Sequence, residues 1–112
     1  MSYDTRLTVT VNTGAADGPV TLTVVDVGNY TSSVAPLWEK ALGFPLHDLN
    51  GRTAGDVVAE LNAAVAKLER DPAGYRAMVP PGSWGSPEGA AQYLHRIRVH
   101  CILHPKTTIE VD

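Results

Sequence analysis

Cysteine, aromatic residues and long apolar runs are scarce in this sequence. It has one cysteine, Cys101, one phenylalanine and only 6% aromatic residues. A single cysteine cannot form a disulfide within the chain, which is consistent with a reducing compartment. No apolar run approaches the roughly eighteen residues that a membrane-spanning helix needs, and the N-terminal MSYDTRLTVTV lacks the basic and apolar regions of a targeting signal. These absences predict a cytoplasmic protein with no membrane partner.

Positive charge and catalytic motifs are scarce as well. Nine Lys and Arg stand against 12 Asp and Glu, for a net charge of -3. This balance argues against general nucleic-acid binding, which needs clustered cations to neutralise phosphates. No nucleophile elbow, phosphate-binding loop or dinucleotide fingerprint is present. We therefore expect no cofactor and favour a protein that is not an enzyme, although a missing motif does not exclude catalysis.

The residues that are present predict one domain over 1–112, since a chain of this length supports a single core. Residues 5–11 (TRLTVTV) and 20–25 (VTLTVV) alternate between apolar residues and threonine, as strands with one covered face do. The turn-forming NTGAADGP between them makes an antiparallel hairpin the natural interpretation.

After residues 28–33 (GNYTSS) the apolar period lengthens from two to nearly four, which is typical of helices. We expect Ser33 to cap the first helix, Thr53 to open the second in a capping box, and Ser86 to cap the last. A final strand, TTIEV, follows Pro105. The expected helical segments are 34–42, 53–68, a short turn at 72–78, and 87–104.

These elements predict an α+β fold of two layers, with a three-stranded, mainly antiparallel sheet in the order β-β-α-α-α-β and all helices on one face. The short turn at 72–78 is an addition to that order. The opposite face of the sheet would carry threonines and one glutamate, and such a face also suits a modest subunit contact, so a homodimer is one expectation. Its predicted members are Thr8, Thr10, Thr21, Thr23, Thr108 and Glu110.

Two polar bends are the strongest candidates for a site. In Gly28–Ser33, unpaired amides at the start of the next helix would suit an anion, and three hydroxyls and an aromatic ring adjoin them. In Pro80–Gly85 (PPGSWG), an indole lies between glycines, either as a lid on the core or as an exposed binding platform. The alternative for the first bend is simple helix capping. The candidate ligand-binding residues here are Asn29, Tyr30, Thr31, Ser32, Ser33 and Trp84.

The only basic concentration is HRIRVHCILHPK, residues 95–106. Arg96 or Arg98 is a candidate counter-ion for an anionic ligand, because a guanidinium fork matches phosphate or carboxylate. His100 and His104 share a helix face, but no third metal ligand is evident, so we expect no metal site. Cys101 falls on the apolar stripe and is expected in the core.

Several short motifs resemble a family of short, uncharacterised bacterial and phage-encoded proteins. They are NYT at 29–31, PLW at 36–38 with AL at 41–42, DPAGYR at 71–76 and PPGSWG at 80–85. The resemblance brings no established activity. It implies only that the two bends belong to one pattern, which favours one shared site.

The leading hypothesis is a protein that holds a small anionic or nucleotide-like ligand between the two bends. If phage-encoded, it would sequester a host signalling molecule. A second hypothesis is a protein–protein interaction module that docks through the Thr-rich face or Trp84. The least favoured is a hydrolase with His47, His100 or His104 as its base.

Overall fold

A long antiparallel hairpin forms the sheet, made of strand β1 (Ser2–Val11) and strand β2 (Val20–Thr31). The chain is described over residues 2–112 in a computed structural model. Strand β3 (Thr108–Val111) pairs antiparallel with the other edge of β1, so the strand order is β2-β1-β3. The predicted three-stranded antiparallel sheet is confirmed.

Four α-helices and three short 3-10 helices connect β2 to β3. The 3-10 helices are η1 (Ser32–Val34), η2 (Leu46–Leu49) and η3 (Ala54–Val57). The α-helices are α1 (Ala35–Leu42), α2 (Val58–Arg70), α3 (Pro72–Arg76) and α4 (Pro87–Leu103).

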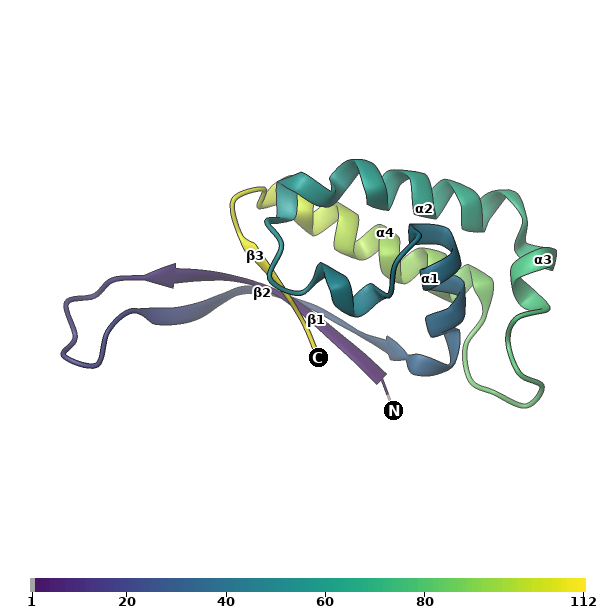
Figure 1. The fold of residues 1–112 in the computed structure, drawn as a ribbon, viewed down its shortest axis with the longest axis horizontal. Coiled ribbons are helices and arrows are strands. Elements are labelled where there is room, and N and C mark those ends of the chain that lie inside the picture. Colours follow the sequence, from purple (N-terminus) through teal and green to yellow (C-terminus); the bar gives the residue numbers. More distant parts are fainter. Residues whose placement is uncertain (1) are drawn as a thin grey trace.

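The helices all lie on one face of the sheet, which gives the expected two-layer α+β arrangement (Figure 1). Along the strands, residues that pair directly share a face, so Leu7 joins Val25 and Ile109 on the helix side. Leu7 and Ile109 are fully buried there, in the core cluster that also contains the apolar residues of α2 and α4. None of the described helices combines the length and apolar character that crossing a bilayer requires.

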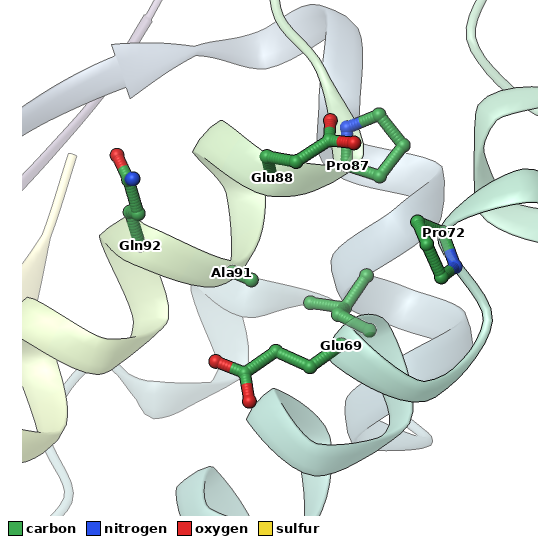
Figure 2. Close-up of a pocket in the computed structure, with 7 residues that line it drawn as sticks. Glu69, Pro72, Pro87, Glu88, Ala91 and Gln92 are labelled. Atoms are coloured by element: carbon green, nitrogen blue, oxygen red, sulfur yellow. The ribbon is translucent and has the colours of Figure 1, made fainter.

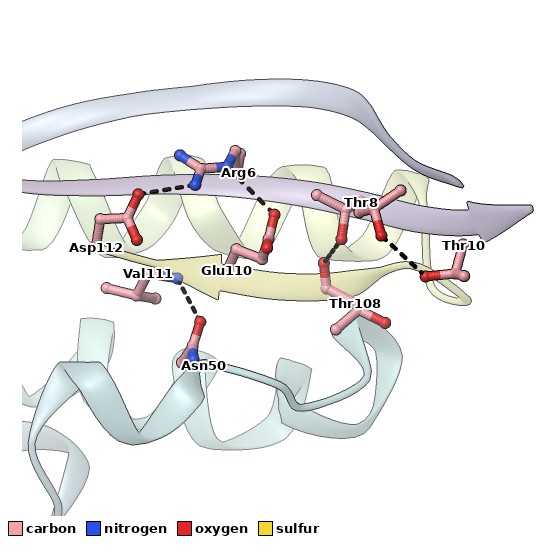
Figure 3. A network of polar contacts seen from close by, with 9 residues as sticks. Arg6, Thr8, Thr10, Asn50, Thr108, Glu110, Val111 and Asp112 are labelled. Carbon is pink, nitrogen blue, oxygen red and sulfur yellow. Dashed lines mark hydrogen bonds and ion pairs between the residues drawn. The ribbon is translucent and has the colours of Figure 1, made fainter. Parts of the chain in front are cut away.

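The opposite face carries the polar side chains that the alternation predicts. The Arg6 guanidinium donates hydrogen bonds to the carboxylates of Glu110, at 3.2 Å, and Asp112, at 2.7 Å (Figure 3). The Thr8 hydroxyl donates to the carbonyl of Thr108 at 3.4 Å. Thr10 shares a hydrogen bond with Thr21 on the same face. These side chains largely satisfy one another across the three strands.

Several helix starts differ from the sequence prediction. The segment from Gly28 to Thr31 is the end of β2 and not a bend, and Thr31 caps the first helical turn in place of Ser33. Thr53 forms no capping box, because the amides of Ala54 and Gly55 donate instead to the carbonyls of Thr107 and Pro105. The backbone before β3 thus takes over the role that a side-chain cap would have.

The predicted starts of α3 and α4 agree with the structure, although α3 ends at Arg76 and not at Met78. Asp71 accepts a hydrogen bond from the amide of Gly74, and Ser86 accepts one from Gly89 at 3.0 Å. Both caps are followed by proline at the first helical position, where its missing N–H has no cost. Cys101 is fully buried in the core, as its place on the apolar stripe of α4 predicts.

The hydroxyl of Tyr93 ties α4 to the sheet at the centre of the molecule. It lies 2.6 Å from the Thr5 hydroxyl and donates toward the carbonyls of Tyr3 and Gly28, at 3.1 and 3.0 Å. Thr5 and Tyr93 are both fully buried. Burial raises the pKa of Tyr93, so the phenol stays protonated and able to donate.

We expect Tyr93→Phe to lower the free energy of unfolding by about 1–3 kcal/mol, because it leaves the buried Thr5 hydroxyl and two carbonyls without this partner. Urea denaturation followed by circular dichroism measures the change. Tyr75→Phe is the matched control: Tyr75 is buried in α3, away from the sheet, and its loss should cost less than about 0.5 kcal/mol. Equal losses in the two variants would contradict a special role for the Tyr93 hydroxyl.

Candidate binding site at the end of strand β2

The end of β2 and the loop before α4 meet around one hollow. Its volume is about 480 Å³, and it is open to solvent. The lining combines polar groups from the strand with an indole from the loop: Ser2, Asn29, Tyr30, Thr31, Trp84 and Gly85. The structure therefore brings together four of the eight residues proposed from the sequence.

Two glycines allow the loop and helix α4 to approach β2 this closely. Gly85 has a φ of 99°, and a Cβ there would lie 2.7 Å from the Thr31 methyl group and 2.8 Å from Val34. A Cβ on Gly89 would overlap the hydroxyl of Tyr30. Both positions must lack a side chain, because backbone of the loop and helix packs directly on the strand end.

Tyr30 belongs to the aromatic core more than to the hollow. Its ring stacks on Tyr93 with centroids 6.1 Å apart and meets Trp38 edge-on at 6.2 Å. Its hydroxyl accepts a hydrogen bond from the amide of Ser86 at 3.2 Å. Tyr30 therefore fixes the start of α4, and only its outer side remains to line the hollow.

Trp84 has the opposite environment, with 83% of its surface exposed. The other tryptophan, Trp38, is fully buried, and its indole N–H donates to the carbonyl of Ala90 at 3.2 Å. Trp84 is the most exposed large apolar side chain among residues 2–112. This exposure shows that Trp84 is not a lid on the core, and the role of an exposed binding platform stays a prediction.

At each of the two helix starts that the sequence proposed for an anion, one amide already has a side-chain partner. The amide of Ser33 donates to Thr31 at 3.4 Å, and the Thr31 hydroxyl donates to that of Ser33. At α4 the Ser86 side chain accepts from Gly89. Ser32 begins η1 and is half-buried, outside the lining of the hollow. Ser32 and Ser33 thus contribute to the turn that ends β2.

Glu88 adds negative charge to the first turn of α4. A hydrogen bond from its own backbone amide, followed by contacts with Arg76, lowers the pKa of Glu88, so its carboxylate is charged at neutral pH. A carboxylate at a helix N-terminus already uses the favourable potential there. An anionic ligand would compete with it at this position.

The two candidate arginines point in different directions. Arg96 lies over the Tyr93 ring at 5.4 Å, and its Nη1 is 3.3 Å from the place a Cβ would take on Gly28, next to Asn29. Arg98 instead donates to Asn62 of α2 at 2.8 Å and contacts His95. Arg96 is therefore on the β2 side of α4, and Arg98 is on the α2 side.

A second hollow, which the sequence did not suggest, lies between α2, α3 and the start of α4 (Figure 2). It measures about 260 Å³. Leu68, Pro72, Pro87 and Ala91 form an apolar floor, with Glu69, Glu88 and Gln92 around it. Its residues come from three helices with no shared motif, so no local pattern could have revealed it.

The histidines form no metal centre in the described part of the chain, where no three metal-ligating side chains come together. His104 lies just past the end of α4 as its C-cap, so the expected His100 and His104 pair is not carried on a continuous helix. None of His47, His100 and His104 lines either hollow.

Comparison with known proteins identifies no relative: no family model, curated protein or solved structure matches the chain. The candidate site is therefore supported by its geometry.

Cys101 should be inert to alkylation in the folded protein. Burial raises its pKa to about 11, so only about one thiol in a thousand is ionised at pH 8, and the sulfur is also inaccessible. We expect negligible labelling by iodoacetamide at pH 8 and full labelling in denaturant, measured by mass spectrometry. Rapid labelling of the native protein would show that α4 opens locally.

Proposed function

We propose that this protein binds a small anionic or nucleotide-like molecule at the hollow between the end of β2 and the Trp84 loop. The single observation that carries the proposal is the exposed Trp84 beside polar groups of Asn29 and Thr31, around one opening. An indole in water offers a flat apolar surface on which a planar ring stacks. The side-chain amide of Asn29 supplies hydrogen bonds that orient such a ring. The Thr31 hydroxyl, whose proton goes to Ser33, can only accept a further hydrogen bond.

The anionic part of the ligand is assigned to Arg96. Its guanidinium lies beside Gly28, one residue before Asn29 on the strand that lines the hollow. Within residues 2–112 Arg96 has no carboxylate partner, whereas Arg52 and Arg76 each have one and Arg6 has two. Arg96 does not line the hollow itself, but a guanidinium without a carboxylate partner near the same strand favours phosphate or carboxylate.

In this proposal the protein binds its ligand without converting it chemically. The residues around the hollow include no carboxylate, histidine or cysteine that would act as a general base or nucleophile. A protein of this kind acts by holding its ligand, as a sequestering protein does.

A protein partner is the second candidate function, and the same 83% exposure of Trp84 favours it. Exposed tryptophans often anchor protein interfaces. The Thr-rich face is less suited, since its side chains bond one another and Thr8 is only 3% exposed. The two candidates differ in whether a small molecule alone changes the environment of Trp84.

Fluorescence titration with nucleoside monophosphates, nucleoside diphosphates, cyclic nucleotides and inorganic phosphate tests the proposal. We expect a base-containing ligand to quench the emission of Trp84, while Trp38 stays constant because it is buried. The same ligand at a hundred times its Kd should stabilise the fold by about 2.7 kcal/mol, which thermal unfolding detects.

Matched variants test which residues contribute to ligand binding. Arg96→Gln should weaken binding about tenfold or more, whereas Arg98→Gln, on the same helix but facing α2, should leave it unchanged. Trp84→Phe should abolish the quenching. If no compound in the panel quenches Trp84 or raises the melting temperature, the small-ligand proposal fails, and protection of Trp84 by a polypeptide would support the second candidate.

A further inference from the structure

The β1–β2 hairpin continues beyond the body of the molecule as a two-stranded arm, residues 9–24 (Figure 1). Pairing with β3 reaches only as far as Thr8, and the helices end where the arm begins (Figure 1). The arm stretches the molecule to 53 × 27 × 19 Å and its radius of gyration to 15.2 Å. A compact domain of this length would have a radius of gyration of about 13 Å.

One face of the arm is apolar and uncovered. Val9 pairs with Leu22 and Val11 with Val20, on the side that nearer the body carries the buried Leu7. Leu22 is 49% exposed, and Val11 and Val20 are nearly as exposed. A lone two-stranded hairpin is marginally stable in water. An apolar face on such an arm therefore indicates that something covers it.

The outer edge of the arm is unpaired, and the irregularities of β2 register, at Val24 and Val27, lie at or beyond the base of the arm. β2 is an edge strand along its full length, so its outer backbone groups have no strand partner. Among the sixteen residues 9–24 only Asp17, in the loop, is charged. Edge strands of monomers usually carry lysines, inward charges, prolines or bulges that prevent pairing. In this arm Pro19 precedes the strand and the first register irregularity falls at Val24, so residues 20–23 carry none of these features. The composition of this arm instead matches the charge-depleted core of an interface.

A complementary apolar surface lies at the end of α4. Val99 and Leu103 follow Arg96 by three and seven residues, so they lie on the same side of the helix. That side borders β2, because Arg96 lies over Gly28. Val99 is 36% exposed and Leu103 is 63% exposed.

We propose that two copies of this chain form a dimer by antiparallel pairing of their β2 edges around a two-fold axis. Antiparallel pairing directs the tip of each arm toward the body of the other copy, and an axis normal to the sheet keeps both helical layers on one side. The apolar face of each arm then lies beneath the partner's Val99 and the partner's Leu103. The contact is isologous: the α4 end of each copy covers the arm of the other copy.

The charge at the tip of the arm and the size of the contact favour a second copy of this chain as the partner that covers the arm. Asp17 at the tip of the arm would approach the end of the partner's α4, where Lys106 supplies a positive charge. The sixteen residues of the arm and the end of α4 together approach the roughly 20 residues per side of a stable interface. The dimer leaves Trp84 free, since its loop lies at the other end of the molecule (Figure 1).

Sedimentation equilibrium of the full chain tests the dimer. We expect the wild type to dimerise and Leu103→Lys to raise the dimer dissociation constant at least about thirty-fold, because it buries a charge in the contact. Leu22→Lys, on the arm, should have the same effect. Both side chains are exposed, so the fold should persist, as circular dichroism would verify.

Ile102→Lys is the matched control. Ile102 is adjacent to Leu103 and 54% exposed, but it follows Arg98 by four residues and so lies on the α2 side. It should leave the dissociation constant unchanged. A wild type that stays monomeric up to about 1 mM would overturn the proposal, as would a dimer insensitive to Leu22→Lys or equally weakened by Ile102→Lys.

Hydrogen exchange tests the edge pairing separately. The outward amides of β2 between residues 20 and 25 should be protected in the wild-type dimer and exchange rapidly in Leu103→Lys. A dimer whose β2 amides exchange as fast as those of the monomeric variant would contradict strand pairing.

Discussion

The buried hydroxyl of Tyr93 is the contact on which the rest of the structure depends. It joins α4 to β1 through Thr5 and to β2 through the carbonyl of Gly28. A polar group in a core stabilises a fold only when its partners are present, and it then fixes one relative position of the elements that it joins. The position of α4 determines where the Trp84 loop, Arg96 and the exposed end of the helix lie.

The candidate binding site follows from that position and from two missing side chains. Gly85 and Gly89 let the loop and α4 pack on Thr31 and Tyr30, and Tyr30 in turn holds the amide of Ser86. Tyr30 is then committed to the aromatic core with Trp38 and Tyr93. Trp84 remains outside this packing, and its exposure is what distinguishes the hollow from an ordinary helix cap.

The two uncovered surfaces of the molecule lie at opposite ends. The loop between α3 and α4, which carries the exposed Trp84, lies at one end of the helical layer, and the arm projects from the other (Figure 1). Between them the sheet face is polar and self-satisfied through Arg6, Glu110 and Asp112. A dimer formed through the arm would therefore leave two ligand sites far apart and equally accessible, one on each copy.

The sequence by itself determined the element types, the α+β class, the caps at Asp71 and Ser86, and the burial of Cys101. These depend on alternation, helical period and local capping, which act over a few residues. Only the tertiary structure decided that Gly28–Thr31 extends β2, because pairing with β1 overrides the local turn preference. It also separated Arg96 from Arg98, brought Trp84 to the strand end, and left the apolar side of the arm uncovered. Those outcomes depend on contacts between residues distant in the chain, and no local pattern records which distant surface a residue meets.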